Sequence, residues 1–172
     1  MLEIIVLNPE DAKIAEEAGA DRVELISAPE LGGLTPSYGM IKEVAQSVAI
    51  PVNVMIRPYA RSFQYSVSEL RAMEEDIVTA KALGVNGVVL GVLNENTGID
   101  TDTLRLLLRR AEGLDVTFHR AIDETADLLQ AVAVLKQFPQ VRRVLTSGGA
   151  QGHIAEHKDL LRSMRDQAGR GL

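Results

Sequence analysis

The sequence contains no cysteine and no tryptophan, and aromatic residues make up only 3% of its 172 residues. The absence of cysteine excludes disulfides, thiolate catalysis and cysteine-ligated metals, and it fits a protein of the reducing cytoplasm. The scarcity of aromatic rings removes the platform on which single-stranded nucleic acids usually stack.

Positive charge is also scarce, because 18 Lys and Arg residues stand against 24 Asp and Glu, for a net charge of −6. Nucleic-acid-binding proteins usually present a basic face, so we expect no nucleic-acid partner. No apolar run approaches the ~20 residues of a membrane-spanning helix, so we expect no membrane partner either. Residues 1–13 lack the basic region and cleavage site of a signal peptide and are expected to begin with a strand.

The hydrophobic residues, 46% of the chain, fall into short β-branched runs that alternate with longer amphipathic stretches. Residues 68–84 show helical spacing of their apolar positions, with Ser68 as the expected N-cap. The predicted buried stripe of this helix consists of Leu70, Met73, Ile77, Ala80 and Leu83. The predicted strands cover residues 2–7, 22–27, 51–58, 87–93, 115–122 and 140–149.

Repeated strand–helix units with nearly uninterrupted apolar strands indicate a parallel sheet covered by helices. Such a sheet is either open and doubly wound or curved into a (β/α) barrel. Six units in 172 residues average about 29 residues each, which is close to the spacing of a TIM barrel. No G-x-G-x-x-G follows the first strand. We therefore predict one α/β domain over residues 1–172, a TIM (β/α) barrel with about six units.

Polar residues recur at the carboxyl ends of the predicted strands, where α/β barrels carry out chemistry. Charged groups inside a buried sheet are costly unless they are paired, so we expect one charge-balanced cluster at the barrel mouth. Two structural alternatives stay open, namely a Glu24–Arg57 ion pair between neighbouring strands and His119 as a core histidine. The predicted cluster consists of Glu3, Glu24, Arg57, His119 and Arg120.

The segment "VTFHRAID" places His119 and Arg120 next to each other, so alternation directs them to opposite faces unless the strand ends there. We expect His119 to face inward with Thr117, while Phe118 packs against the helices. Asp123 is either a site residue or the N-cap of the next helix.

The segment "TSGG", residues 146–149, offers backbone N–H groups and hydroxyls that suit an oxyanion or phosphate, with Ser147 as a binding residue. His153 and His157 have the i, i+4 spacing of a helical metal pair. They lack the Glu of H-E-x-x-H and lie in a polar segment, so a solvated helix start is the better interpretation. We assign no metal ligands.

Six segments follow one another along the chain: "GADRVEL", "GGLTPSYG", "IPVNVMIRP", "FQYS", "VTFHRAID" and "RVLTSGG". In this order they resemble the CutC family, whose members are described as cytoplasmic copper-homeostasis proteins with a TIM-barrel fold. The resemblance implies copper as ligand, a homodimer or larger homo-oligomer, and a site at the strand ends on Glu24, Arg57, His119 and Ser147. The family often has "VELC" where this chain has "VELI", which puts Ile26 at the cysteine position. Cu(I) prefers sulfur ligands, so these residues argue against direct chelation through sulfur.

The chain also ends where the resemblance leads us to expect a seventh and an eighth strand, so we expect a C-terminally incomplete barrel or one closed by a partner chain. Two functions compete. One is copper homeostasis, as the resemblance implies. The other is an enzyme for a small phosphorylated or carboxylated metabolite, with His119 as acid/base assisted by Glu24 and with Arg57, Arg120 and Ser147 binding the anion. A third possibility is a fragment that keeps only the fold.

Overall fold

The computed structural model describes residues 1–149, 154–169 and 172. Its six parallel strands form one sheet in the order β1-β2-β3-β4-β5-β6, so every strand lies beside its neighbour in sequence. This order confirms the predicted strand–helix repeats and the barrel-type winding, because an open doubly wound sheet would reverse its order. The strands are β1 (Glu3–Val6), β2 (Arg22–Leu25), β3 (Val52–Met55), β4 (Gly87–Leu90), β5 (Asp115–Phe118) and β6 (Val141–Val144).

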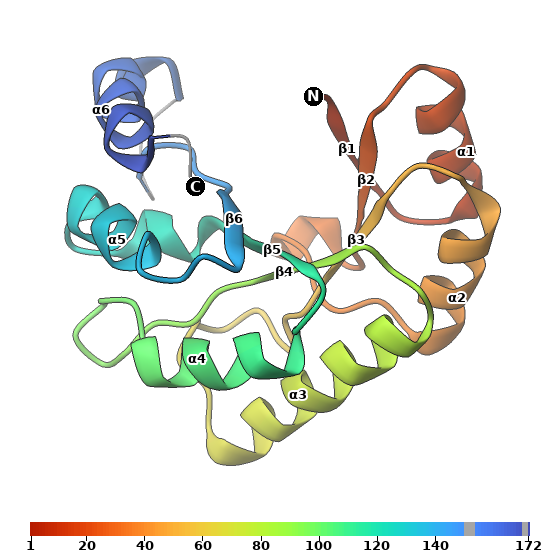
Figure 1. The fold of residues 1–172 in the computed structure, drawn as a ribbon, viewed down its shortest axis with the longest axis horizontal. Coiled ribbons are helices and arrows are strands. Elements are labelled where there is room, and N and C mark those ends of the chain that lie inside the picture. The colour runs from red at the N-terminus through yellow and green to blue at the C-terminus, as the bar shows by residue number, and fades with distance from the viewer. Residues whose placement is uncertain (150–153, 170–171) are drawn as a thin grey trace.

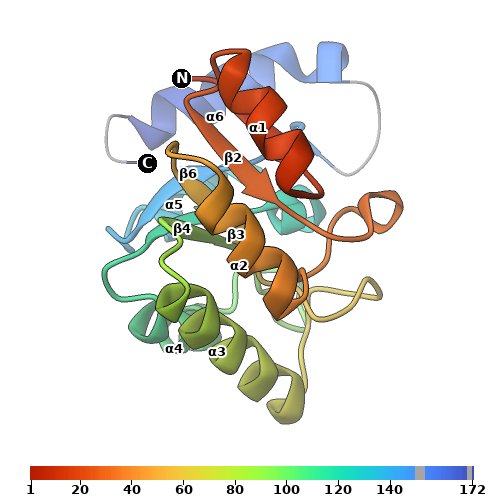
Figure 2. The same cartoon turned by 90° about the vertical axis from the view of Figure 1, so that its right-hand side faces the viewer.

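The helices lie around the outside of the curved sheet, with α1, α2 and α3 following one another along its outer side (Figures 1 and 2). Three short 3-10 helices lie in the loops, at Pro29–Leu31, Arg120–Glu124 and Ile154–His157. No helix in the described part of the chain has the length and apolarity needed to cross a membrane. The α-helices are α1 (Pro9–Glu17), α2 (Tyr38–Ser47), α3 (Val67–Ala82), α4 (Thr101–Arg110), α5 (Leu128–Leu135) and α6 (Lys158–Ala168).

The helix caps explain where several of these helices begin. Ser37 caps α2, and its hydroxyl accepts a hydrogen bond from the Met40 N–H. The expected N-cap of α3, Ser68, was wrong by two residues. Ser66 is its N-cap and forms a reciprocal capping box with Glu69, so Ser68 lies within the first turn.

The main core lies between the outer face of the sheet and the helices. The predicted stripe of α3 is confirmed, since Met73, Ile77 and Ala80 are fully buried and Leu70 and Leu83 pack against the same cluster. A second, small apolar cluster of Ile26, Met55 and Val89 lies apart from it. These three residues alternate with core positions of their strands, so they belong to the inner face of the curved sheet.

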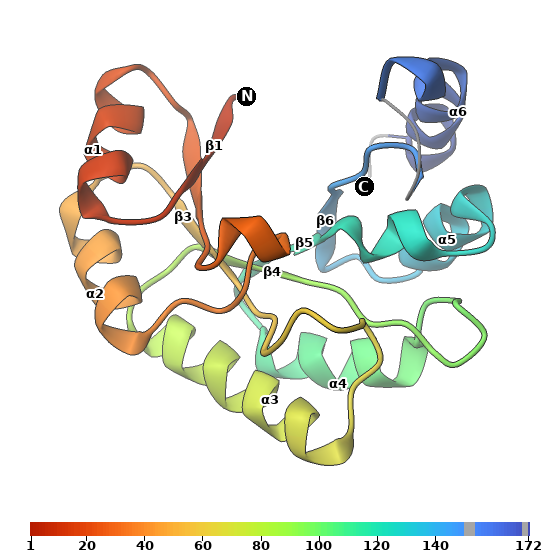
Figure 3. The ribbon, with the colours of Figure 1, turned by 180° about the vertical axis from the view of Figure 1, so that it is seen from behind.

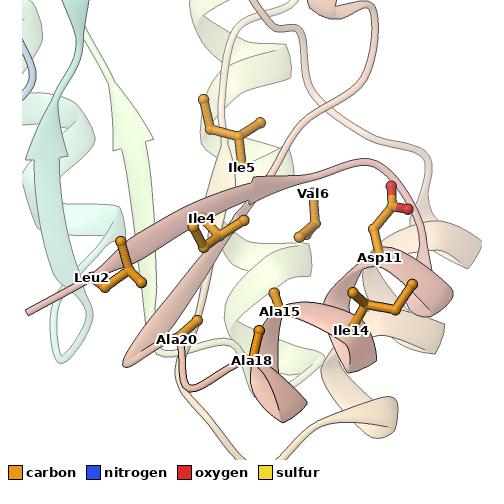
Figure 4. Close-up of a pocket in the computed structure, with 9 residues that line it drawn as sticks. All are labelled: Leu2, Ile4, Ile5, Val6, Asp11, Ile14, Ala15, Ala18 and Ala20. Atoms are coloured by element: carbon orange, nitrogen blue, oxygen red, sulfur yellow. The ribbon is translucent and has the colours of Figure 1, made fainter.

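The sheet does not close, because no pairing joins β1 to β6 among the described residues (Figures 1 and 3). At the β1 edge, Leu2 and Ile5 are 51% and 56% exposed. A hollow of about 290 Å³ between this strand and α1 is lined almost entirely by aliphatic side chains (Figure 4). The edges thus carry exposed apolar surface of the kind that folded sheets normally cover.

Candidate functional site

A cavity of about 420 Å³ brings together Glu24, Arg57, His119 and Arg120, four of the five predicted site residues. They come from β2 and from the segments that follow β3 and β5, so the cavity lies toward the carboxyl ends of the strands. Most of the remaining wall is apolar. The apolar lining consists of Ile5, Ile26, Pro29, Leu31, Met55, Phe63 and Leu145.

Glu24 lines the cavity together with two further acidic side chains, Asp123 and Glu124, and is only 2% exposed. Burial and the neighbouring charge of Glu3 raise its pKa to about 7, and a hydrogen bond with Glu3 acts in the same direction. The charge of Arg22 lowers the pKa of Glu24 and so reduces this rise, but the Arg22 Nε is hydrogen-bonded to Glu3. Glu24 therefore exchanges its proton near neutral pH, which is the range in which a carboxyl group works best as an acid or a base.

His119 is 3% exposed and faces inward, as expected, while Phe118 packs in the main core and Thr117 accepts a hydrogen bond from Arg143 Nε at 3.1 Å. Its Nδ1 accepts the Ala121 N–H at 3.1 Å, so the neutral ring carries its proton on Nε2. Nε2 is buried and has no hydrogen-bond partner in the part of the chain that the structure describes. Burial, followed by the charge of Arg57, lowers the pKa of His119 to about 3.

Arg57 is 7% exposed and holds two loops together at the cavity wall. Its guanidinium donates to the carbonyl oxygens of Leu31 at 3.0 Å, Gly33 at 3.2 Å and Ala60 at 3.2 Å. It also lies 4.6 Å from the centre of the Phe63 ring. No carboxylate pairs with Arg57 among the ion pairs of the described residues, and its Nε is buried without a partner. Among the described residues, the cavity thus contains a buried positive charge that forms no ion pair with an acidic side chain, although Glu24, Asp123 and Glu124 also line the wall.

Arg120, Asp123 and Ser147 form a separate polar network at the edge of the cavity. Asp123 accepts from Arg120 Nε at 3.2 Å, from Ser147 N at 2.9 Å and from Ser147 Oγ at 2.8 Å. Thr146 Oγ1 and Gly149 N also donate to its carboxylate. Burial alone would raise the pKa of Asp123, but these hydrogen bonds outweigh it and lower the pKa.

This network changes three expectations. Asp123 does not cap the next helix, because Asp127 is the N-cap of α5 and Asp123 lies in the preceding 3-10 helix. Alternation does not extend to Arg120, because His119 is still extended but Arg120 begins the 3-10 helix; the Arg120 side chain stays 60% exposed and its Nη2 reaches Ser147 Oγ at 3.0 Å. Ser147 does not line the cavity, and Asp123 already occupies its N–H and hydroxyl.

The predicted charged side chains do not form a single cluster, because Arg57 has no ion-pair partner among the described residues while Glu3 and Arg22 pair with each other. Glu3 forms an ion pair with Arg22 and a hydrogen bond with Glu24, and the described residues contain no Glu24–Arg57 ion pair. The reason is register, since Glu3 lies opposite Arg22 in the β1–β2 pairing and the two side chains meet directly. Arg57 is left to the backbone carbonyls of the loops.

The sequence interpretation missed two residues, Phe63 in the cavity wall and Arg22 beside Glu3. Phe63, in "FQYS", packs against both Arg57 and His119, with ring centroids 4.9 Å apart in the second pair. Arg22 appeared only as a strand residue, although its position two residues before Glu24 on the same face was a usable signal. The suggested His153–His157 pair falls partly outside the described residues, because His153 is not among them.

Among the described residues, no group of three or more His, Asp or Glu side chains is placed to hold a metal ion. The soft donors that line the cavity are the Met55 thioether and the His119 imidazole. Cu(I) favours sets of thiolate and thioether ligands. This cavity therefore does not offer the donor set of a Cu(I) site.

Comparison with known proteins identifies the family. The family model described as CutC family matches residues 1–171. A family protein CutC from Enterobacter sp. (strain 638) is 47% identical over 148 residues, which cover 86% of this chain and only 60% of that protein. The structure of a candidate copper homeostasis protein CutC from Streptococcus agalactiae superposes with a TM-score of 0.91 at 36% identity, covering 98% of this chain and 83% of that one.

A more distant structure, that of phosphonopyruvate hydrolase, superposes with a TM-score of 0.65 at 14% identity over 95% of this chain and 63% of that one. Identity this low carries the fold alone. The family model and the high identity to a curated relative lead to one conclusion. The chain belongs to the CutC family.

Proposed function

We propose that the cavity binds a small metabolite carrying a carboxylate or phosphate group, and that Glu24 exchanges a proton with it. The observation that carries this proposal is the buried Arg57 guanidinium, which forms no ion pair with a carboxylate of the described residues. It lies on the same cavity wall as His119, whose Nε2 has no hydrogen-bond partner among those residues. A bound anion would neutralise the first group and accept a hydrogen bond from the second.

The division of roles differs from the one that the sequence suggested. His119, with a pKa near 3, is neutral at physiological pH and acts as a hydrogen-bond donor. Glu24, with a pKa near 7, takes the acid/base role instead. Arg120, exposed at the mouth, attracts the anion as it enters, while Ser147 holds Arg120 in place.

Copper homeostasis is the second candidate, and the name of the Streptococcus agalactiae protein favours it. In this chain the proposal requires copper to bind without cysteine. The positive charge of Arg57 repels a cation at the same place. We therefore propose the anion as the ligand of this cavity.

We further propose that the protein is cytoplasmic, which the absence of cysteine supports.

The test is a thermal-shift screen with carboxylated and phosphorylated metabolites. A ligand at 100 times its Kd stabilises the folded state by roughly 2.7 kcal/mol, or about 5–10 °C for a chain of this size. We expect the shift to disappear in Arg57→Gln and to persist in Arg109→Gln, a matched change at an exposed position of α4. Circular dichroism establishes that both variants fold.

Two outcomes would overturn the proposal. The first is a screen in which no compound raises the melting temperature, or in which the hits survive Arg57→Gln. The second is a calorimetric titration in which copper binds more tightly than about 1 µM and His119→Ala abolishes the binding, because a metal would then use the group assigned to the anion.

A further inference from the structure

Gly91 directly follows β4 and lies against the His119 ring. A Cβ atom built on Gly91 would approach His119 Cε1 to 2.5 Å and Ala121 Cβ to 2.9 Å, and His119 Nδ1 would be closer still. Carbon atoms in folded proteins do not approach one another so closely. Any side chain at position 91 would therefore displace the imidazole.

The backbone offers no other reason for a glycine here. Gly91 is absent from the described residues with positive φ, so its backbone conformation is open to other residues as well. Gly19 and Gly84, by contrast, adopt φ of +90° and +83° after helix ends, where glycine is favoured for its conformational freedom. Space for the His119 ring is the requirement that distinguishes Gly91.

The ring is held on its other sides as well. The Ala121 N–H occupies Nδ1, and Phe63 packs at 4.9 Å between ring centroids. The ring nitrogen left for a ligand is Nε2. We propose that Gly91 is a positioning residue, which leaves room for the Nδ1–Cε1 edge of the His119 imidazole and so presents Nε2–H as a fixed hydrogen-bond donor to the bound anion. This inference rests on the proposed anion site.

The first experiment measures the ring itself and requires no ligand. Nitrogen-15 NMR of the imidazole groups, with His119 assigned by His119→Gln, reports which ring nitrogen carries the proton. In the wild-type protein we expect the Nε2–H form from pH 5 to pH 8. In Gly91→Ala we expect this form to be lost, as mixed tautomers or as a ring that titrates in that range. Unchanged His119 signals in Gly91→Ala would overturn the proposal.

The second experiment is a double-mutant cycle with inorganic phosphate and malonate as probes. A hydrogen bond to a charged group contributes about 1.5–3 kcal/mol, so Gly91→Ala should weaken binding about 10- to 100-fold. In a His119→Ala background the same change should alter affinity less than twofold, because the ring that it displaces is absent. Gly39→Ala is the matched control, since a Cβ at Gly39 meets no atom within 4 Å.

The two experiments separate the failure of this inference from that of the proposed function. An equal loss of affinity from Gly91→Ala with and without His119 would show that position 91 acts through the backbone and would refute the positioning role. If neither probe binds the wild-type protein, the anion site is refuted. The NMR comparison still decides whether Gly91 positions the ring.

Discussion

The protonation of Glu24 can be tested through the pH dependence of folding. The pKa of this carboxyl is about 7 in the folded protein, against 4.5 for an ordinary glutamate, mainly because the group is buried and secondly because Glu3 is close. Between these two values the folded state binds more protons than the unfolded chain. Stability therefore falls as the pH rises through this window, and the loss is complete above the folded pKa.

The size of the effect follows from the two values. At about 1.4 kcal/mol for each tenfold change in the proton equilibrium, the difference corresponds to roughly 3 kcal/mol. Glu24→Gln removes the titration and keeps a similar shape with the ability to donate a hydrogen bond to Glu3. The free energy of unfolding of this variant relative to the wild type should therefore increase by roughly 3 kcal/mol between pH 4.5 and pH 8.

The assay is urea denaturation of both proteins at half-unit pH steps, with Glu17→Gln, an exposed change in α1, as the control. The control should follow the wild-type profile throughout. If the Glu24→Gln and wild-type profiles run parallel, Glu24 is ionised at neutral pH in the folded protein. The acid/base role proposed for it would then lose its basis.

Three further outcomes follow from the structure. Asp123→Asn should lower the free energy of unfolding by about 2–4 kcal/mol at pH 7, because the carboxylate accepts hydrogen bonds from five donors. This loss should shrink below the ordinary Asp pKa of 3.8, and a pH-independent loss would contradict the charge-based reasoning. Ser66→Ala should cost about 1 kcal/mol in urea denaturation and Ser68→Ala close to nothing, and the reverse order would refute the capping box. The exposed β1 edge should make the chain self-associate, and Leu2→Lys should weaken this association in sedimentation velocity; a wild-type monomer at about 100 µM would rule it out.

The local features of this protein could be predicted because they depend on spacing alone. Every predicted strand formed, since each combines a β-branched run with a following helical pattern. The inward orientation of His119 followed from alternation with Phe118, because a side chain that packs under the helices leaves its neighbour to face the other side. Glu24, Arg57, His119 and Arg120 meet in one cavity because parallel strands end at the same edge of the sheet.

The partners of these side chains could not be predicted in the same way. Glu3 forms its ion pair with Arg22 because of the strand register, which no single strand encodes. Arg57 donates to carbonyl oxygens of two loops, and the paths of those loops depend on the whole fold. Asp123 binds the N–H groups after β6, about 24 residues further along the chain, so its role could not be read from its own segment.

The sequence by itself thus determined the alternation of strands and helices, the sheet order of a barrel and the set of polar residues at its mouth. Periodicity and composition act over a few residues, so the chain carries this information locally. The tertiary structure alone decided which groups are charged. It buries His119 beside Arg57 and lowers its pKa to about 3, and it places Glu24 beside Glu3 and raises its pKa to about 7. Among the described residues it leaves Arg57 without an ion pair. Protonation depends on burial and on neighbouring charges, and both exist only after distant segments have packed together.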